Sequence, residues 1–127
     1  MINIKKYLLK SYDYPSCWAL VTDICVNEYN VNLDHILNPE NSKNIKSLQE
    51  AFLLFILKNK SYKIQSNPVQ GAIVLMYKNY VDKPDHCGIY YQNQILHAST
   101  TMPMLEPISN MKDRYNKLEY GIIKHDY

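Results

Sequence analysis

Apolar side chains recur at helical spacing after Ser16 and predict a helix that begins there. Pro15 suits the approach to a helix, and Ser16 is a good N-cap residue. Cys17 would then lie in the first helical turn. The apolar positions of this helix are Trp18, Leu20, Val21, Ile24 and Cys25.

A second helix is predicted to begin near Ser47 and to end near Asn59. Ser47 and Glu50 have the spacing of a capping box, and residues 51–57 are apolar almost all round. Such a helix is expected to be buried. Its side chains expected in the core are Phe52, Phe55 and Ile56.

The second half of the chain is rich in strand signals. Residues 72–77 predict a buried strand after the break at 66–68. A short extended piece is expected between Pro103 and Pro107, followed by a helical turn over residues 110–117 and a closing strand over 120–125.

Residues 85–99 predict a hairpin with a two-residue turn at 92–93. This register sets Gly88 opposite His97 and places His86 on the same face of the sheet, diagonal to His97. Diagonal neighbours are roughly 7–8 Å apart at the backbone, which is within reach of two imidazoles. Because Gly88 has no side chain, we expect the space between the two histidines to be empty. The hairpin therefore brings two histidines together.

Composition fits a single folded domain over residues 1–127. Apolar residues make up 46% of the chain and charged residues 20%, which argues against disorder. The net charge of +2 is too small to indicate a nucleic-acid partner. Residues 1–10 lack the features of a signal peptide, and no apolar run is long enough to span a membrane.

Cys17 is the best candidate for a catalytic residue. The free N–H groups and the positive dipole at a helix start favour thiolate, the form that attacks a carbonyl carbon. A strand histidine as base, and a second polar residue to orient it, would complete the arrangement of cysteine peptidases. His86 and His97 can supply these two groups.

The remaining cysteines and histidines have simpler interpretations. Cys25 and Cys87 are expected to be buried structural residues, and His35 and His125 to be solvated. A zinc site built from His86, Cys87, His97 and another cysteine is the alternative, but adjacent strand residues point to opposite faces and no familiar zinc-ligand spacing occurs. We expect no metal and no cofactor.

Four short motifs follow one another along the chain: Cys17-Trp18-x-Leu20-Val21, Pro68-x-x-Gly71-x-Ile73-Val74, His86-x-Gly88-Ile89-Tyr90 and His97-Ala98. In this order they resemble the NlpC family of papain-like cysteine peptidases, and the resemblance runs from about Tyr12 to Ser99. Cys-Trp at the nucleophile position, in place of the usual Cys-Ser, is similar to the phage-encoded branch.

The resemblance implies an α+β, papain-like NlpC-type fold, with an N-terminal helix carrying the nucleophile packed on a small antiparallel sheet. It implies Cys17 as nucleophile, His86 as base and His97 as the third polar residue. A tyrosine shortly before the nucleophile, Tyr12 or Tyr14, would support the oxyanion.

By the same resemblance the substrate is a peptidoglycan stem peptide, cut at a D-glutamyl to diamino-acid bond. The protein would be a phage or bacterial factor for cell-wall degradation, associated with tail or other virion proteins or delivered to the wall by another route, and otherwise cytoplasmic. The alternatives are acyl transfer or deamidation on the same scaffold, and a non-catalytic particle component that kept the fold.

Overall fold

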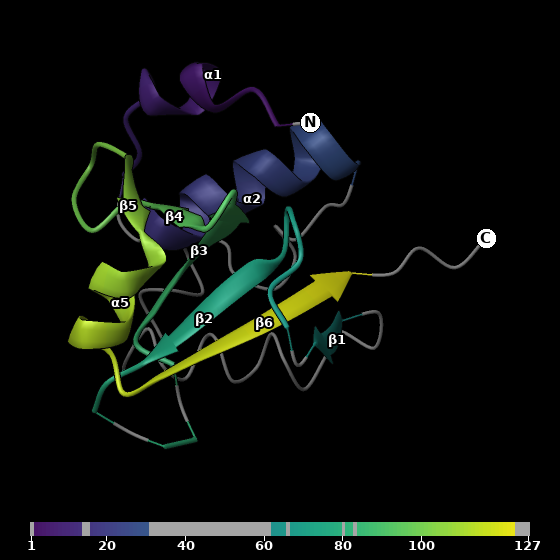
Figure 1. Ribbon diagram of the computed structural model, residues 1–127. Helices are drawn as coiled ribbons and strands as arrows, with labels where there is room; N and C mark the ends of the chain where they lie inside the picture. Colours follow the sequence, from purple (N-terminus) through teal and green to yellow (C-terminus); the bar gives the residue numbers. More distant parts are fainter. Residues whose placement is uncertain are drawn as a thin grey trace, which may run out of the picture.

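The protein is an α+β domain built on one six-stranded antiparallel sheet, which confirms the α+β class predicted from the sequence (Figure 1). The computed structural model describes residues 2–13, 16–30, 62–65, 67–79, 81–82 and 84–123. The helices are α1 (Ile4–Leu8), α2 (Ser16–Tyr29) and α5 (Ile108–Arg114). The strands are β1 (Tyr62–Gln65), β2 (Ile73–Tyr77), β3 (His86–Tyr91), β4 (Gln94–His97), β5 (Met104–Pro107) and β6 (Lys117–Ile123).

The strands follow the order β1-β6-β2-β3-β4-β5, and every neighbouring pair is antiparallel. β2 lies inside the sheet, and each of its residues is buried. This burial explains why residues 73–77 form an unbroken apolar run, since a strand covered on both faces has no solvent side on which to place polar groups.

The β3–β4 hairpin has the two-residue turn that its sequence predicts. Tyr91 pairs with Gln94, and the backbone φ angles of Gln92 and Asn93 are 47° and 64°. Positive φ at both central residues is typical of the tight turn whose twist matches that of the flanking strands. The turn therefore fixes the register that places the histidines.

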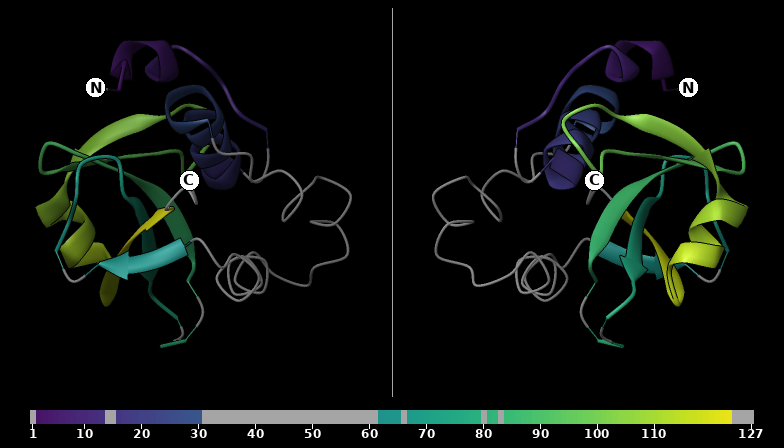
Figure 2. Two further views of the ribbon diagram at one scale, coloured as in Figure 1. Left: turned by 90° about the vertical axis from the view of Figure 1, so that its right-hand side faces the viewer. Right: turned by 90° about the vertical axis from the view of Figure 1, so that its left-hand side faces the viewer.

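Two hydrophobic layers cover the faces of the sheet, with α2 on one side and α5 on the other (Figure 2). In the first layer the buried face of α2 packs on β3 and β4. In the second layer Ile108 and Met111 of α5 pack over Val74, Met76 and Ile95. At roughly 1.5–3 kcal/mol for each fully buried aliphatic side chain, these layers supply most of the drive to fold.

Several element boundaries differ from the sequence prediction. Ser16 is the first residue of α2 instead of its N-cap, and its hydroxyl donates a hydrogen bond of 2.9 Å to the carbonyl oxygen of Tyr12. The C-terminal helix begins at Ile108 and the last strand at Lys117, both earlier than expected. That last strand does not close an edge, because it lies between β1 and β2.

Two short elements, α1 and β1, have no counterpart in the sequence prediction, because neither has enough residues to show a hydrophobic period. The helix expected between Ser47 and Asn59, with Phe52, Phe55 and Ile56, lies outside the described residues, as do His35 and His125. Within the part of the chain that the structure describes, no helix has the length and apolar character needed to cross a membrane.

Candidate active site

Cys17 is the second residue of α2 and is buried, with 4% of its surface exposed. Its partners are the first two residues of β3, His86 and Cys87. Because His86 stands at the end of its strand, groups from both sides of the sheet can meet there. The helix start predicted from the sequence and the strand histidine are thus in contact.

The surroundings of Cys17 favour the thiolate. Hydrogen bonding from the Cys87 thiol, from His86 and from the Cys87 backbone N–H, together with the charge of His86, lowers the pKa of the Cys17 thiol to about 5, although burial opposes this shift. Burial alone raises the pKa of Cys25 to about 12, and burial and the neighbouring Cys17 raise that of Cys87. Only one of the three cysteines is therefore suited to be a nucleophile at neutral pH.

His86 and His97 form a direct hydrogen bond across the hairpin. His86 Nε2 lies 2.8 Å from His97 Nδ1, and the two rings are nearly perpendicular, at 86°. Since Nε2 of His86 is engaged in this way, Nδ1 is the ring nitrogen left for the Cys17 thiol. The diagonal placement predicted from the register is confirmed.

Gly88 is necessary for this contact. A Cβ atom at Gly88 would lie 2.7 Å from the Leu96 carbonyl oxygen, 2.7 Å from Ile95 Cγ2 and 3.1 Å from His97 Cβ. The sequence predicts an empty space between the two histidines. The structure instead shows that β4 fills this space, so that no side chain fits at position 88.

A buried carboxylate extends the hydrogen-bond chain beyond His97. Glu106 Oε1 of β5 lies 2.8 Å from His97 Nε2, and Arg114 of α5 donates to both carboxylate oxygens at 3.3 and 3.1 Å. Asn110 adds a weaker contact of 3.4 Å to Glu106 Oε2. The continuous chain is therefore Cys17, His86, His97, Glu106 and Arg114.

The surroundings of His97 and Glu106 set their ionisation states. Burial and the neighbouring His86 hold the pKa of His97 below its ordinary value, which outweighs the opposite effect of Glu106. Burial would raise the pKa of Glu106, but hydrogen bonds from Arg114, His97 and Asn110 lower it. At neutral pH His97 is thus uncharged and Glu106 is ionised.

Sequence reasoning missed Glu106, whose position follows only from the pairing of β5 with β4. Glu106 pairs with Ile95 across β4 and β5, so it lies on the same sheet face as His97 and diagonal to it. This relationship repeats the one between His86 and His97. It could not be read from the sequence, because residues 98–103 contain no turn motif that fixes the register.

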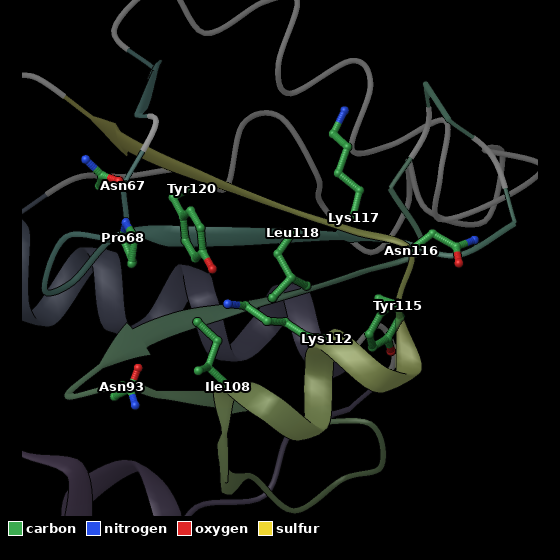
Figure 3. Close-up of a pocket in the computed structure, with 10 residues that line it drawn as sticks. All are labelled: Asn67, Pro68, Asn93, Ile108, Lys112, Tyr115, Asn116, Lys117, Leu118 and Tyr120. Atoms are coloured by element: carbon green, nitrogen blue, oxygen red, sulfur yellow. The ribbon is translucent and has the colours of Figure 1, made fainter.

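Tyr115 connects this site to a surface pocket. Its ring is parallel to that of His86 at 8°, with centroids 6.0 Å apart, and it also lines a cavity of about 440 Å³ (Figure 3). This volume is within the usual range for small-ligand sites. The other lining residues are Asn67, Pro68, Asn93, Ile108, Lys112, Asn116, Lys117, Leu118 and Tyr120.

The two lysines at this pocket differ in direction. In Figure 3 the Lys112 side chain extends over the hollow, whereas Lys117 points the other way. Lys117 instead lies over the Tyr77 ring, 4.3 Å from its centroid, and pairs with Glu119 at 3.6 Å. Lys112 is therefore the cation that a ligand in this pocket would meet.

The structure does not bring the Tyr12 hydroxyl to Cys17. That hydroxyl donates a 2.6 Å hydrogen bond to Asp23, which also pairs with Lys10 at 2.8 Å. Six residues along a helix correspond to roughly 9 Å, so Asp23 holds Tyr12 well away from the thiol. Tyr14, the other candidate for the oxyanion site, lies outside the described residues.

No set of three His, Cys, Asp or Glu side chains among the described residues is arranged to hold a metal ion. In particular, the Cys87 thiol is directed to Cys17, whereas His86 and His97 bond to each other. The mixed zinc site considered from the sequence would need these groups to converge on one point.

No family model matches this chain, and no curated protein matches its sequence.

Proposed function

We propose that the protein is a thiol-dependent amide hydrolase of papain-like, NlpC type, with Cys17 as nucleophile, His86 as base and His97 as the residue that orients His86. The observation that carries this proposal is the 2.8 Å bond between His86 and His97, next to a thiol whose pKa is lowered to about 5. A buried structural cysteine would show the opposite shift, as Cys25 does.

The chemistry follows from these positions. The Cys17 sulfur attacks the substrate carbonyl carbon, and the carbonyl electron pair moves to oxygen, near the N-terminal end of α2, whose dipole favours negative charge. His86 gives its proton to the leaving amine as the C–N bond breaks, which leaves a thioester on Cys17. His86 then removes a proton from water, and the hydroxyl displaces the sulfur to release a carboxylic acid.

The substrate we propose is a peptidoglycan stem peptide, because such peptides are acidic and the pocket beside Tyr115 presents a cation. Lys112 would pair with a free carboxylate of the stem. The side-chain amides of Asn67 and Asn93, which also line the pocket, can bond to peptide groups.

The direct test is digestion of purified peptidoglycan, and of a soluble stem peptide, followed by mass spectrometry of the products. We expect new amino and carboxyl ends at one amide bond, with Cys17→Ala inactive but melting at the wild-type temperature. Loss of ammonia alone would indicate a deamidase, and joining of two peptides an acyltransferase. Equal products from wild type and Cys17→Ala would refute the proposal.

Two lysine variants test the pocket. Lys112→Met should raise KM for a stem peptide with free carboxylates by about tenfold and leave kcat unchanged, as loss of one charge-assisted hydrogen bond predicts. Lys117→Met is the matched control, since its ammonium group is directed to Tyr77 and Glu119. Equal KM values for the two variants would show that the stem carboxylate does not bind at Lys112.

A further inference from the structure

We infer that Glu106 is a positioning residue that fixes the tautomers of both histidines, so that the free electron pair of His86 faces Cys17. The inference rests on the proposed hydrolase function, but its geometry is independent of the substrate. It assigns a role to a carboxylate on β5 that makes no contact with Cys17 itself.

Glu106 is held as an ionised carboxylate. Its side chain is 10% exposed and is held from α5 by Arg114 at both oxygens. An ionised carboxylate only accepts hydrogen bonds. His97 Nε2, 2.8 Å from Glu106 Oε1, must therefore carry the proton of that bond.

The bond to Glu106 fixes the tautomer of His97. Its side chain is fully buried, and a neutral imidazole carries one proton, which the bond to Glu106 places on Nε2. His97 Nδ1 is then an acceptor. It faces His86 Nε2 at 2.8 Å and Ser99 Oγ at 3.3 Å, and both of these groups can donate.

The tautomer of His97 in turn fixes that of His86. Since His97 Nδ1 accepts, His86 Nε2 donates, which places the proton of a neutral His86 on Nε2 and leaves the electron pair on Nδ1. Nδ1 is the nitrogen available to Cys17. When Nδ1 takes the thiol proton, His86 becomes a cation whose Nε2–H still donates to His97. The row of hydrogen bonds therefore accepts the charge without rearrangement.

An amide in place of the carboxylate removes the constraint. In Glu106→Gln the amide could present its NH₂ group to His97 Nε2, which would move the His97 proton to Nδ1. Whenever His86 is charged, its Nε2–H group would then face the Nδ1–H group of His97, and neither could accept a hydrogen bond. The thiolate–imidazolium state would become less stable, and the pKa of Cys17 would rise.

The wild-type protein provides the first test, which needs no substitution at Glu106. Nitrogen-15 chemical shifts of the imidazole rings at pH 7.5 distinguish protonated from unprotonated ring nitrogens, and comparison with His97→Asn identifies the His97 signals. We expect neutral His97 with its proton on Nε2. A proton on Nδ1, or on both nitrogens, would overturn the inference.

The second test is the pH dependence of Cys17 alkylation by iodoacetamide. In Glu106→Gln the midpoint should move upward by about one pH unit or more, because a charge and a hydrogen bond that favour the ion pair are lost. Glu119→Gln is a matched control, since Glu119 is also a strand carboxylate, with 14% of its side chain exposed, and it bonds to Tyr77 and Lys117 away from the site. Its midpoint should equal that of wild type.

Among the described residues, the titratable or charged groups around these hydrogen bonds are Cys17 of α2, Asp85 before β3, His86 and Cys87 of β3, Arg114 of α5 and Tyr115. None of these is altered in either Glu variant. A wild-type midpoint in folded Glu106→Gln would contradict the role of Glu106.

Turnover of a stem peptide distinguishes a failure of the proposed hydrolase function from a failure of the role of Glu106. If stem peptides are substrates, Glu106→Gln should lower kcat by roughly 10²-fold with KM unchanged, since Glu106 does not contact the pocket. If no wall peptide is cut even by wild type, the proposed substrate is wrong, and the nitrogen shifts and alkylation midpoints still decide the role of Glu106.

Discussion

The reactivity of Cys17 toward iodoacetamide provides a quantitative prediction, which depends on two opposing effects. Taking its pKa as about 5, and an ordinary thiol pKa as near 8.5, the thiolate of Cys17 is about 300-fold more populated at pH 6. A less basic sulfur is also a weaker nucleophile, and this pKa difference lowers the intrinsic rate by about 25- to 60-fold.

The net advantage of Cys17 over an ordinary thiol is thus only about five- to tenfold at pH 6, and by pH 8 the order is reversed. A single rate at neutral pH would therefore reveal little. The shape of the profile is decisive. Because the thiolate is lost only as pH falls through about 5, the labelling rate of Cys17 should be half-maximal near pH 5 and constant from about pH 6.5 upward.

The assay is time-resolved alkylation from pH 4 to 9, with peptide mass spectrometry to read each cysteine separately. Cys25 and Cys87 should remain unlabelled in the folded protein at pH 6, because burial holds both as thiols. In His86→Gln the Cys17 midpoint should move toward that of an ordinary thiol. A wild-type rate that still rises tenfold per pH unit between pH 6 and 8 would refute the proposed thiolate.

Four further predictions concern the groups around the two histidines. Gly88→Ala should destabilise the fold by about 1–3 kcal/mol in thermal melts, because the added carbon meets the rigid Leu96 carbonyl oxygen at 2.7 Å; an unchanged melting temperature would contradict this packing. His97→Asn keeps a polar group for His86 and should retain about tenfold more turnover than His97→Ala, whereas equal turnover would make the side chain a bystander. Cys87→Ala should raise the alkylation midpoint of Cys17 more than Cys87→Ser, since only serine keeps a donor; matching midpoints would exclude side-chain donation. Because the pKa of His97 is lowered in the folded state, the unfolded chain takes up a proton first, so stability should fall as pH drops below about 6.5, and less steeply in His97→Asn; parallel slopes would contradict this.

The sequence predicts the parts of the site that depend on local chemistry. The turn at 92–93 fixes the register of its hairpin, so the diagonal contact of His86 and His97 follows from the sequence alone. Likewise, the apolar period after Ser16 places Cys17 in the first turn of α2.

The groups that the sequence did not reveal depend on how separate elements pair and pack. The side chain of Cys87 points to the sheet face opposite that of His86, as predicted. Its thiol nevertheless donates to Cys17, because α2 packs against the start of β3. Glu106 meets His97 only through the pairing of β5 with β4, and Arg114 reaches Glu106 only because α5 folds back over that edge. No local period or turn residue encodes these contacts.

The most direct test of the account is a search for the covalent intermediate. The protein is mixed with a soluble stem peptide, quenched with acid within the first turnover, and its intact mass is measured. We expect a fraction of the protein to gain the mass of the acyl part of the peptide, attached as a thioester to Cys17, and no such gain in Cys17→Ala. Hydrolysis by wild type and by Cys17→Ala at equal rates, with no acyl adduct on Cys17, would contradict the assignment of Cys17 as the nucleophile.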